Sequence, residues 1–150
     1  MNMGTMTNDE IKEFCVLWSK TNAAYKLGNL QFPEPLIKRI VVDKFDSSLV
    51  INQGVSTYDY VGNVELKTIS ENDNGTPFKH TQSNCKRIIY VQIKGTLAEI
   101  FELRSEDVKT INEKIKHHAK SNQKSKQLTI HCSKYIANAV NHVTIDLANY

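Results

Sequence analysis

Three charged side chains, Asp59, Glu65 and Lys67, occur close together in the segment 56–69, which otherwise has the character of a β-hairpin. Side chains alternate between the two faces of a strand, so Glu65 and Lys67 are expected to point the same way. If residues 61–63 form a three-residue loop, Asp59 lies opposite Glu65 and shares that face. Two carboxylates could then hold a divalent cation, with an ammonium group beside them.

The same spacing also suits an ordinary solvated sheet face. A surface Glu–Lys pair with a neighbouring aspartate is worth about 0–1 kcal/mol and has no functional meaning. Short acidic-x-Lys patterns also arise by chance in many proteins. The local spacing alone leaves both interpretations open.

The elements around this hairpin can be predicted from hydrophobic periodicity and turn residues. In the hairpin strand, Val64, Leu66 and Ile69 are expected on the face opposite Glu65 and Lys67. The segment 76–86 is expected to be polar and weakly helical at best. We expect helices from Thr7 or Asn8 to about Leu27, from Pro33 to near Lys44 and from Ser105 onward, strands at 48–52, 64–69, 87–93, 97–103 and 127–132, and a short helix, a strand or both within 136–147.

The composition is that of an ordinary globular domain. The chain has 150 residues, 40% of them hydrophobic, and a formal net charge of +3. This length suits one domain spanning residues 1–150. The expected fold class is α/β (α+β), with a mixed, antiparallel-rich central sheet flanked by helices.

The cysteines and the N-terminal segment predict a protein that stays in the cytoplasm. Cys15, Cys85 and Cys132 are widely spaced and lack metal-ligand spacing, so we expect small buried hydrophobic residues in a reducing compartment. No apolar run approaches the ~20 residues of a membrane span, and no secretion signal is recognisable in residues 1–8. We therefore expect no membrane association.

Positive charge is concentrated in the C-terminal half, between residues 109 and 134, where Glu113 is the single acid. Lysine supplies charge to phosphates, and Asn and Gln amides can pair with base edges. A solvated helix end followed by a flexible loop explains the same residues without any ligand. The candidate DNA-binding residues are Lys79, His80, Lys86, Lys116, Lys120, Asn122, Gln123, Lys124 and Lys126.

The order of elements, the hairpin around Glu65-Leu66-Lys67-Thr68, the apolar strand 87–93 and the lysine-rich C-terminal region resemble the PD-(D/E)xK nuclease superfamily. Within it, the chain is most similar to small Type II restriction endonucleases. At residue level the likeness is confined to Asp59, Glu65, Lys67 and a few flanking positions.

This resemblance implies a catalytic site of Asp59, Glu65 and Lys67. Asp59 and Glu65 would bind Mg²⁺, or Mn²⁺ in its place, and Lys67 would contact the attacking water. Asp46 is an alternative first metal ligand, and Glu34 is the best candidate for a supporting acid on an early helix. Gln82 could order the nucleophile or touch DNA, but a plain surface amide is the simpler interpretation.

The function implied is that of a Mg²⁺-dependent Type II restriction enzyme that cuts double-stranded DNA at a specific short site. By the same analogy we expect a homodimer, because two-fold protein symmetry matches a palindromic site. A repair or junction-resolving nuclease of the same fold is one alternative. A non-catalytic nucleic-acid-binding module, in which only the lysines matter, is another.

Overall fold

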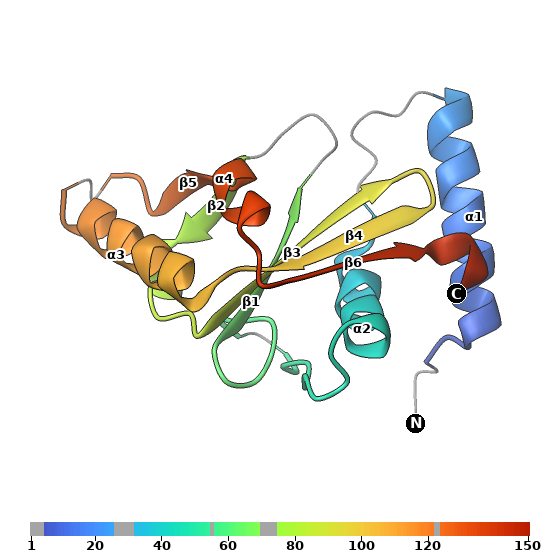
Figure 1. The fold of residues 1–150 in the computed structure, drawn as a ribbon, viewed down its shortest axis with the longest axis horizontal. Coiled ribbons are helices and arrows are strands. Elements are labelled where there is room, and N and C mark those ends of the chain that lie inside the picture. Colours follow the sequence, from blue (N-terminus) through green and yellow to red (C-terminus); the bar gives the residue numbers. More distant parts are fainter. Residues whose placement is uncertain (1–4, 26–31, 55, 70–74, 122–123) are drawn as a thin grey trace.

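The computed structural model describes residues 5–25, 32–54, 56–69, 75–121 and 124–150, and its centre is a four-stranded mixed sheet (Figure 1). The strands are β1 (Val64–Ile69), β3 (Arg87–Lys94), β4 (Leu97–Glu102) and β6 (Asn141–Asp146), in the order β1-β3-β4-β6. β1 and β3 run parallel, whereas β3–β4 and β4–β6 are antiparallel. The expected α+β class and the antiparallel-rich sheet are therefore confirmed.

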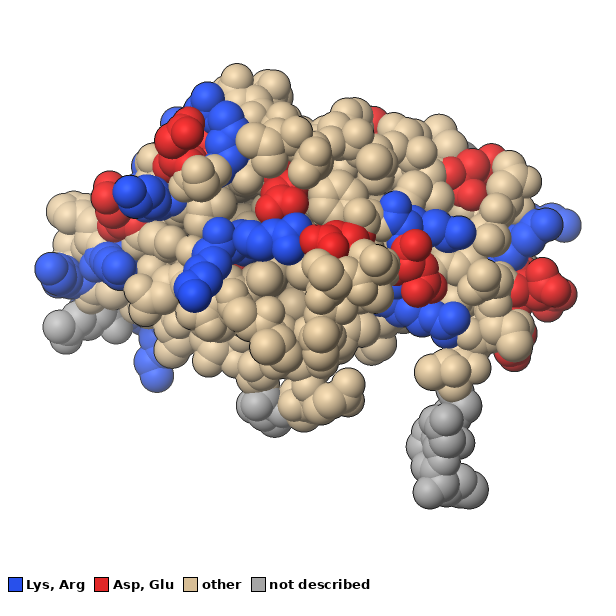
Figure 2. All heavy atoms as spheres, turned by 60° about the horizontal axis from the view of Figure 1, so that its bottom comes forward, with Lys and Arg blue, Asp and Glu red and all other residues tan. Residues whose placement is uncertain are grey.

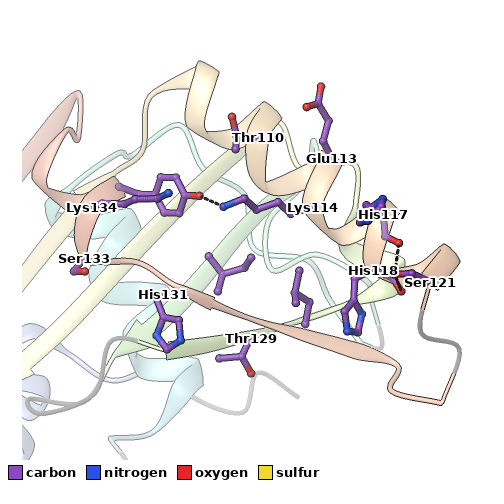
Figure 3. Close-up of a pocket in the computed structure, with 13 residues that line it drawn as sticks. Thr110, Glu113, Lys114, His117, His118, Ser121, Thr129, His131, Ser133 and Lys134 are labelled. Atoms are coloured by element: carbon purple, nitrogen blue, oxygen red, sulfur yellow. Dashed lines mark hydrogen bonds between the residues drawn. The ribbon is translucent and has the colours of Figure 1, made fainter.

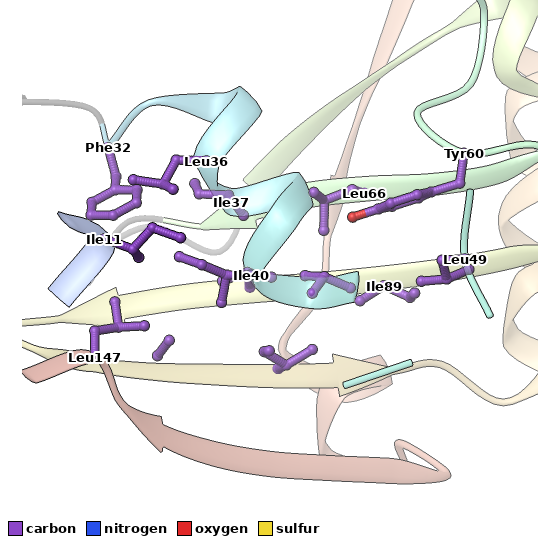
Figure 4. Packing of buried hydrophobic residues seen from close by; sticks show 14 of the residues in the cluster. Ile11, Phe32, Leu36, Ile37, Ile40, Leu49, Tyr60, Leu66, Ile89 and Leu147 are labelled. Carbon is purple, nitrogen blue, oxygen red and sulfur yellow. The ribbon is translucent and has the colours of Figure 1, made fainter. Parts of the chain in front are cut away.

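Two helices cover one face of the sheet: α1 (Asn8–Tyr25) and α2 (Glu34–Lys44). Thr7 and Glu10 form a reciprocal capping box at the start of α1, and a proline occupies the first turn of α2. The apolar stripe of α2, which includes Ile40, packs on inward-facing strand residues such as Leu66 and Ile89 (Figure 4). Burial of this face anchors β1 from one side.

The opposite face is covered by α3 (Ser105–Ser121) and by a two-stranded antiparallel sheet of β2 (Gly75–Lys79) and β5 (Gln127–His131). Short helical segments η1 (His80–Gln82), α4 (Ser133–Ala137) and η2 (Leu147–Asn149) complete the chain. The helix α3, the two-stranded sheet and α4 lie at one end of the molecule, and α1 lies at the other (Figure 1). Ile111 and Ile115 of α3 pack with Ile88 and Tyr90 of β3 in a second apolar cluster.

The structure corrects the prediction for residues 76–86. Thr76 and Phe78 are buried while Pro77 and Lys79 are exposed, an alternation typical of a strand, and β5 supplies the pairing partner. Segment 48–52 forms only an isolated bridge, between Ile51 and Tyr60, instead of a strand. For 136–147, the structure contains both the end of a helix and a strand.

A second correction concerns the faces of β1. Ile69 packs in the same cluster as Ile88 and Tyr90, on the side of the sheet that carries Glu65 and Lys67. Val64 and Leu66 pack on the other side, as expected. The error arose because residues 64, 66 and 69 do not share one parity along a strand.

The three cysteines are buried, as expected, and all three are free thiols. In the described part of the chain, no helix is long and apolar enough to cross a membrane.

Candidate metal-binding and catalytic site

The site is built on the turn that leads into β1. Tyr60 bridges Val64 in antiparallel fashion, which leaves residues 61–63 as the three-residue loop expected from the sequence. Gly62 has a φ of 90° and Asn63 a φ of 59°, the left-handed conformation that glycine and asparagine tolerate best. This loop places Asp59 directly across from Glu65.

The two carboxylates converge on one backbone group. The Leu66 amide donates a hydrogen bond of 2.9 Å to Asp59 Oδ2 and a longer one of 3.3 Å to Glu65 Oε1. The side chains of Asp59 and Glu65 also share a hydrogen bond with each other. The structure therefore brings this predicted pair together at the outer edge of β1.

Burial and proximity push the pKa values of the pair in opposite directions. Burial, followed by the hydrogen bond to Asp59, raises the pKa of Glu65 to about 9, and Glu65 is only 2% exposed. Burial opposes ionisation of Asp59 as well, but hydrogen bonds from Glu65, the Leu66 amide and Lys38 lower its pKa. Of the two carboxylates, Glu65 is therefore the more basic and the one that takes up a proton first as pH falls.

One oxygen of this site lacks a hydrogen bond among the described residues, and the Lys67 ammonium group, 3.6 Å away, is its ion-pair partner. Glu65 Oε2 is buried and accepts no hydrogen bond in the described part of the chain. A buried, unsatisfied carboxylate oxygen is costly, and such groups cluster where a ligand or ion supplies the missing interaction. Carboxylate oxygens are the ligands that Mg²⁺ prefers, so the residues present fit this cation.

The chain itself offers few ligands to that ion. Among the described residues, no group of three or more His, Cys, Asp or Glu side chains could hold a metal. Mg²⁺ commonly uses one or two carboxylates and completes its octahedron with water and substrate phosphate oxygens. Two carboxylates, placed as those of Asp59 and Glu65 are, match that number of protein ligands.

Lys67 lies beside the carboxylate pair as predicted. Its Nζ is 3.6 Å from Glu65 Oε2, and it donates a hydrogen bond of 2.7 Å to the Pro77 carbonyl. The ammonium group also lies over the Phe78 ring, 4.5 Å from its centroid. The Lys67 side chain is 15% exposed, so its charge is partly shielded from water and directed at the site.

No match to this chain was found among family models, curated proteins or solved structures. Function is therefore inferred from the geometry of these residues.

A second cation, Lys38, was not predicted. It projects from α2, and its Nζ lies 3.1 Å from Asp59 Oδ1. The Tyr60 hydroxyl donates a hydrogen bond of 2.9 Å to the Lys38 carbonyl, which adds a polar contact between this helix and the hairpin. The sequence gives no local signal for this contact, since Lys38 and Asp59 belong to different elements.

Two alternative acids occupy other environments. Asp46 forms an ion pair with Arg87 at 2.9 Å and accepts hydrogen bonds from Ser48. The aspartate next to Glu65 is therefore Asp59. Glu34 is exposed at the start of α2. The early helix contributes a lysine to the site and not the supporting acid that was expected.

Gln82 is buried, and the simpler interpretation as a surface amide is wrong. It is 8% exposed, and its Oε1 accepts hydrogen bonds from Lys67 Nζ at 3.3 Å and from the Lys79 amide at 2.9 Å. The pairing of β2 with β5, which the sequence did not reveal, brings η1 next to β1.

Four of the candidate DNA-binding residues line one groove, with a volume of about 920 Å³, which we call the basic groove. Its lysine and histidine members are Lys79, His80, Lys124 and Lys126, contributed by the β2–η1 junction and the segment before β5. Within the described residues, none of the three lysines forms an ion pair, so their charges are available to phosphates. This groove adjoins the site through the Lys79–Gln82 contact.

The other candidates are placed differently. Lys116 and Lys120 are exposed on α3 outside the basic groove, and Lys86 is exposed before β3. Asn122 and Gln123 lie outside the described residues. On the face drawn in Figure 2, Lys and Arg side chains alternate with Asp and Glu side chains, in keeping with the small net charge of +3.

A neighbouring groove of about 840 Å³ lies between α3, β5 and α4 (Figure 3). Lys114 crosses it and donates a hydrogen bond of 2.9 Å to the Tyr135 hydroxyl. His118, on its rim, hydrogen-bonds to His80 of the basic groove, with 2.9 Å between the ring nitrogens. Sequence reasoning did not predict this pair, because the two histidines are 38 positions apart.

Proposed function

We propose that this protein is a Mg²⁺-dependent endonuclease that hydrolyses phosphodiester bonds in double-stranded DNA, acting as a Type II restriction enzyme. The observation that carries the proposal is the buried Glu65 carboxyl group beside Asp59 and Lys67, whose Oε2 accepts no hydrogen bond from the described residues. Burying a carboxylate in this way costs stability, and such a cost is typical of sites selected for chemistry. A solvated sheet face would leave Glu65 exposed to water.

In this proposal each side chain of the site has a defined task. Asp59 and Glu65 would hold Mg²⁺, or Mn²⁺ in its place, which supplies positive charge for the scissile phosphate and makes water easier to deprotonate. Lys67 would donate a hydrogen bond to the attacking water or to a phosphate oxygen. The water oxygen would bond to phosphorus and release one proton to solvent, the bond from phosphorus to the leaving oxygen would break, and that oxygen would take up a proton from solvent.

The basic groove would receive the DNA backbone next to this site. Lysine contacts to phosphates fix the position of a duplex and give binding without sequence information. Specificity would come from a homodimer that matches a short two-fold symmetric site. We expect the protein in the cytoplasm, with the DNA that it would cut.

The test is incubation of the purified protein with plasmid DNA, with Mg²⁺ and with EDTA. Discrete bands that vanish with EDTA are expected for a restriction enzyme. A smear would indicate a nonspecific nuclease, and a shifted but intact plasmid would indicate the non-catalytic binding module. Intact, unshifted plasmid of varied sequence would contradict the proposal.

A further inference from the structure

The Lys67 ammonium group is held by a small number of fixed acceptors. Ammonium carries three N–H donors and no acceptor. Two of them are taken by the Pro77 carbonyl and by Gln82 Oε1, and Glu65 Oε2 lies 3.6 Å away on the remaining side. Pro77 and Gln82 therefore determine where the third N–H points.

Gln82 is itself held at both ends. Its Oε1 faces two donors, the Lys67 ammonium and the Lys79 amide, while its Nε2 donates a hydrogen bond of 3.2 Å to the Thr57 carbonyl. Turning the amide over would set its NH₂ group against both donors and its oxygen against a carbonyl. The network thus allows one orientation only, the one in which Gln82 accepts from Lys67.

The segment that carries Gln82 also forms part of the basic groove. Lys79 and His80 line that groove. The Lys79 amide donates a hydrogen bond to the same Gln82 oxygen that accepts from Lys67. The Tyr58 hydroxyl donates to the Thr81 carbonyl at 3.5 Å and accepts from the Asn84 amide, which ties this segment to the hairpin. One buried side chain thus connects the groove wall, the hairpin and the lysine of the site.

We propose that Gln82 is a positioning residue that holds the Lys67 ammonium group in place for the reaction. The expected effect of Gln82 on catalysis rests on the proposed nuclease function. A reacting group displaced by ~1 Å can lose about 10²-fold in rate. Loss of the Gln82 acceptor should therefore slow the chemical step and leave DNA affinity nearly unchanged.

The first measurement is independent of cleavage. The side-chain ammonium signal of Lys67 is recorded by ¹H–¹⁵N NMR in protein without metal or DNA, and is assigned by its loss in K67M. We expect a protected signal in the wild type and in Q82E, which keeps an acceptor oxygen, and a signal lost to exchange in Q82M. Gln53→Met, at an exposed glutamine, is the matched control and should leave the signal intact.

The second measurement is single-turnover DNA cleavage with Mg²⁺, together with DNA affinity in Ca²⁺. Q82M should lower the cleavage rate by about 10²-fold with affinity within about twofold of wild type. If Q82M does not fold, Q82N, which shortens the side chain by one methylene, should weaken the ammonium signal in folded protein.

Two results would overturn the inference. One is a Lys67 signal that persists in folded Q82M or Q82N, and the other is a signal lost in folded Q82E. If the wild type cleaves no DNA, the proposed function is contradicted but the inference about Gln82 is not. The ammonium signal still reports whether Gln82 positions Lys67.

Discussion

Glu65 links the stability of this protein to its proposed chemistry. An acid with a raised pKa in the folded state keeps its proton where the unfolded chain has released it. The unfolded state then binds fewer protons, and the free energy of unfolding falls as pH rises. Asp59, whose pKa is lowered, acts in the opposite sense and only at acid pH.

The first prediction concerns this pH dependence. Between about pH 4.5 and about pH 9, Glu65 should make the wild type progressively less stable, because the folded state retains the Glu65 proton through this range. E65Q cannot ionise, so its stability should change less with pH and should exceed that of wild type at pH 8. Urea unfolding from pH 5 to 9 measures this, with E34Q as the control at an exposed acid. Equal slopes for wild type and E65Q would contradict it.

The second prediction concerns Lys38. Its ammonium group pairs with Asp59 at 3.1 Å, so it competes with a metal ion for the same carboxylate and repels the incoming charge. K38M should bind Mn²⁺ roughly tenfold more tightly, about 1.4 kcal/mol, by isothermal titration calorimetry. Lys12→Met, an exposed position on α1, should not change the affinity. Weaker binding by K38M would mean that Lys38 supports the site.

The third prediction concerns the turn between Asp59 and Glu65. Gly62 has a φ of 90°, so an alanine there should cost about 1–2 kcal/mol of stability. G62A should also reduce cleavage, because the turn sets the alignment of the two carboxylates. Gly54, with a φ of 70°, supplies the matched control.

G54A should lose similar stability and keep its activity when both are measured well below the unfolding temperature. Equal loss of cleavage in G54A and G62A would show that the effect comes from general destabilisation.

The fourth prediction concerns the basic groove. Each lysine that neutralises a phosphate adds about 0.9 to the slope of log affinity against log salt. K124Q/K126Q should therefore weaken DNA binding and reduce the slope by about 1.8. K12Q/K20Q on α1 removes the same charge at the other end of the molecule and should leave the slope near that of wild type. Fluorescence anisotropy with labelled DNA over a series of salt concentrations measures both slopes.

For the molecule as a whole, local features were predictable and tertiary ones were not. The alignment of Asp59 with Glu65 followed from a three-residue loop, which is a short-range property. The apolar periodicity of helices α1, α2 and α3, together with the acidic residues in their first turns, predicted these helices. Ile69 lies on the face of Glu65 and Lys67, contrary to expectation, because residues 65, 67 and 69 alternate together along the strand.

The parts of the site that could not be predicted come from distant segments. The sequence did not predict β2, because its partner β5 follows about 50 residues later. This pairing brings Gln82 to Lys67. Lys38 reaches Asp59 only because α2 packs on the sheet. Long-range pairings of this kind leave little trace in a single sequence.

The most direct test of the central claim is DNA cleavage by E65Q. Glutamine keeps the shape of Glu65 but cannot ionise to bind a metal ion, so E65Q should remain folded and bind DNA while cleavage with Mg²⁺ falls below detection. E34Q should cut like the wild type. Cleavage by folded E65Q at the wild-type rate would show that Asp59, Glu65 and Lys67 are not the catalytic site.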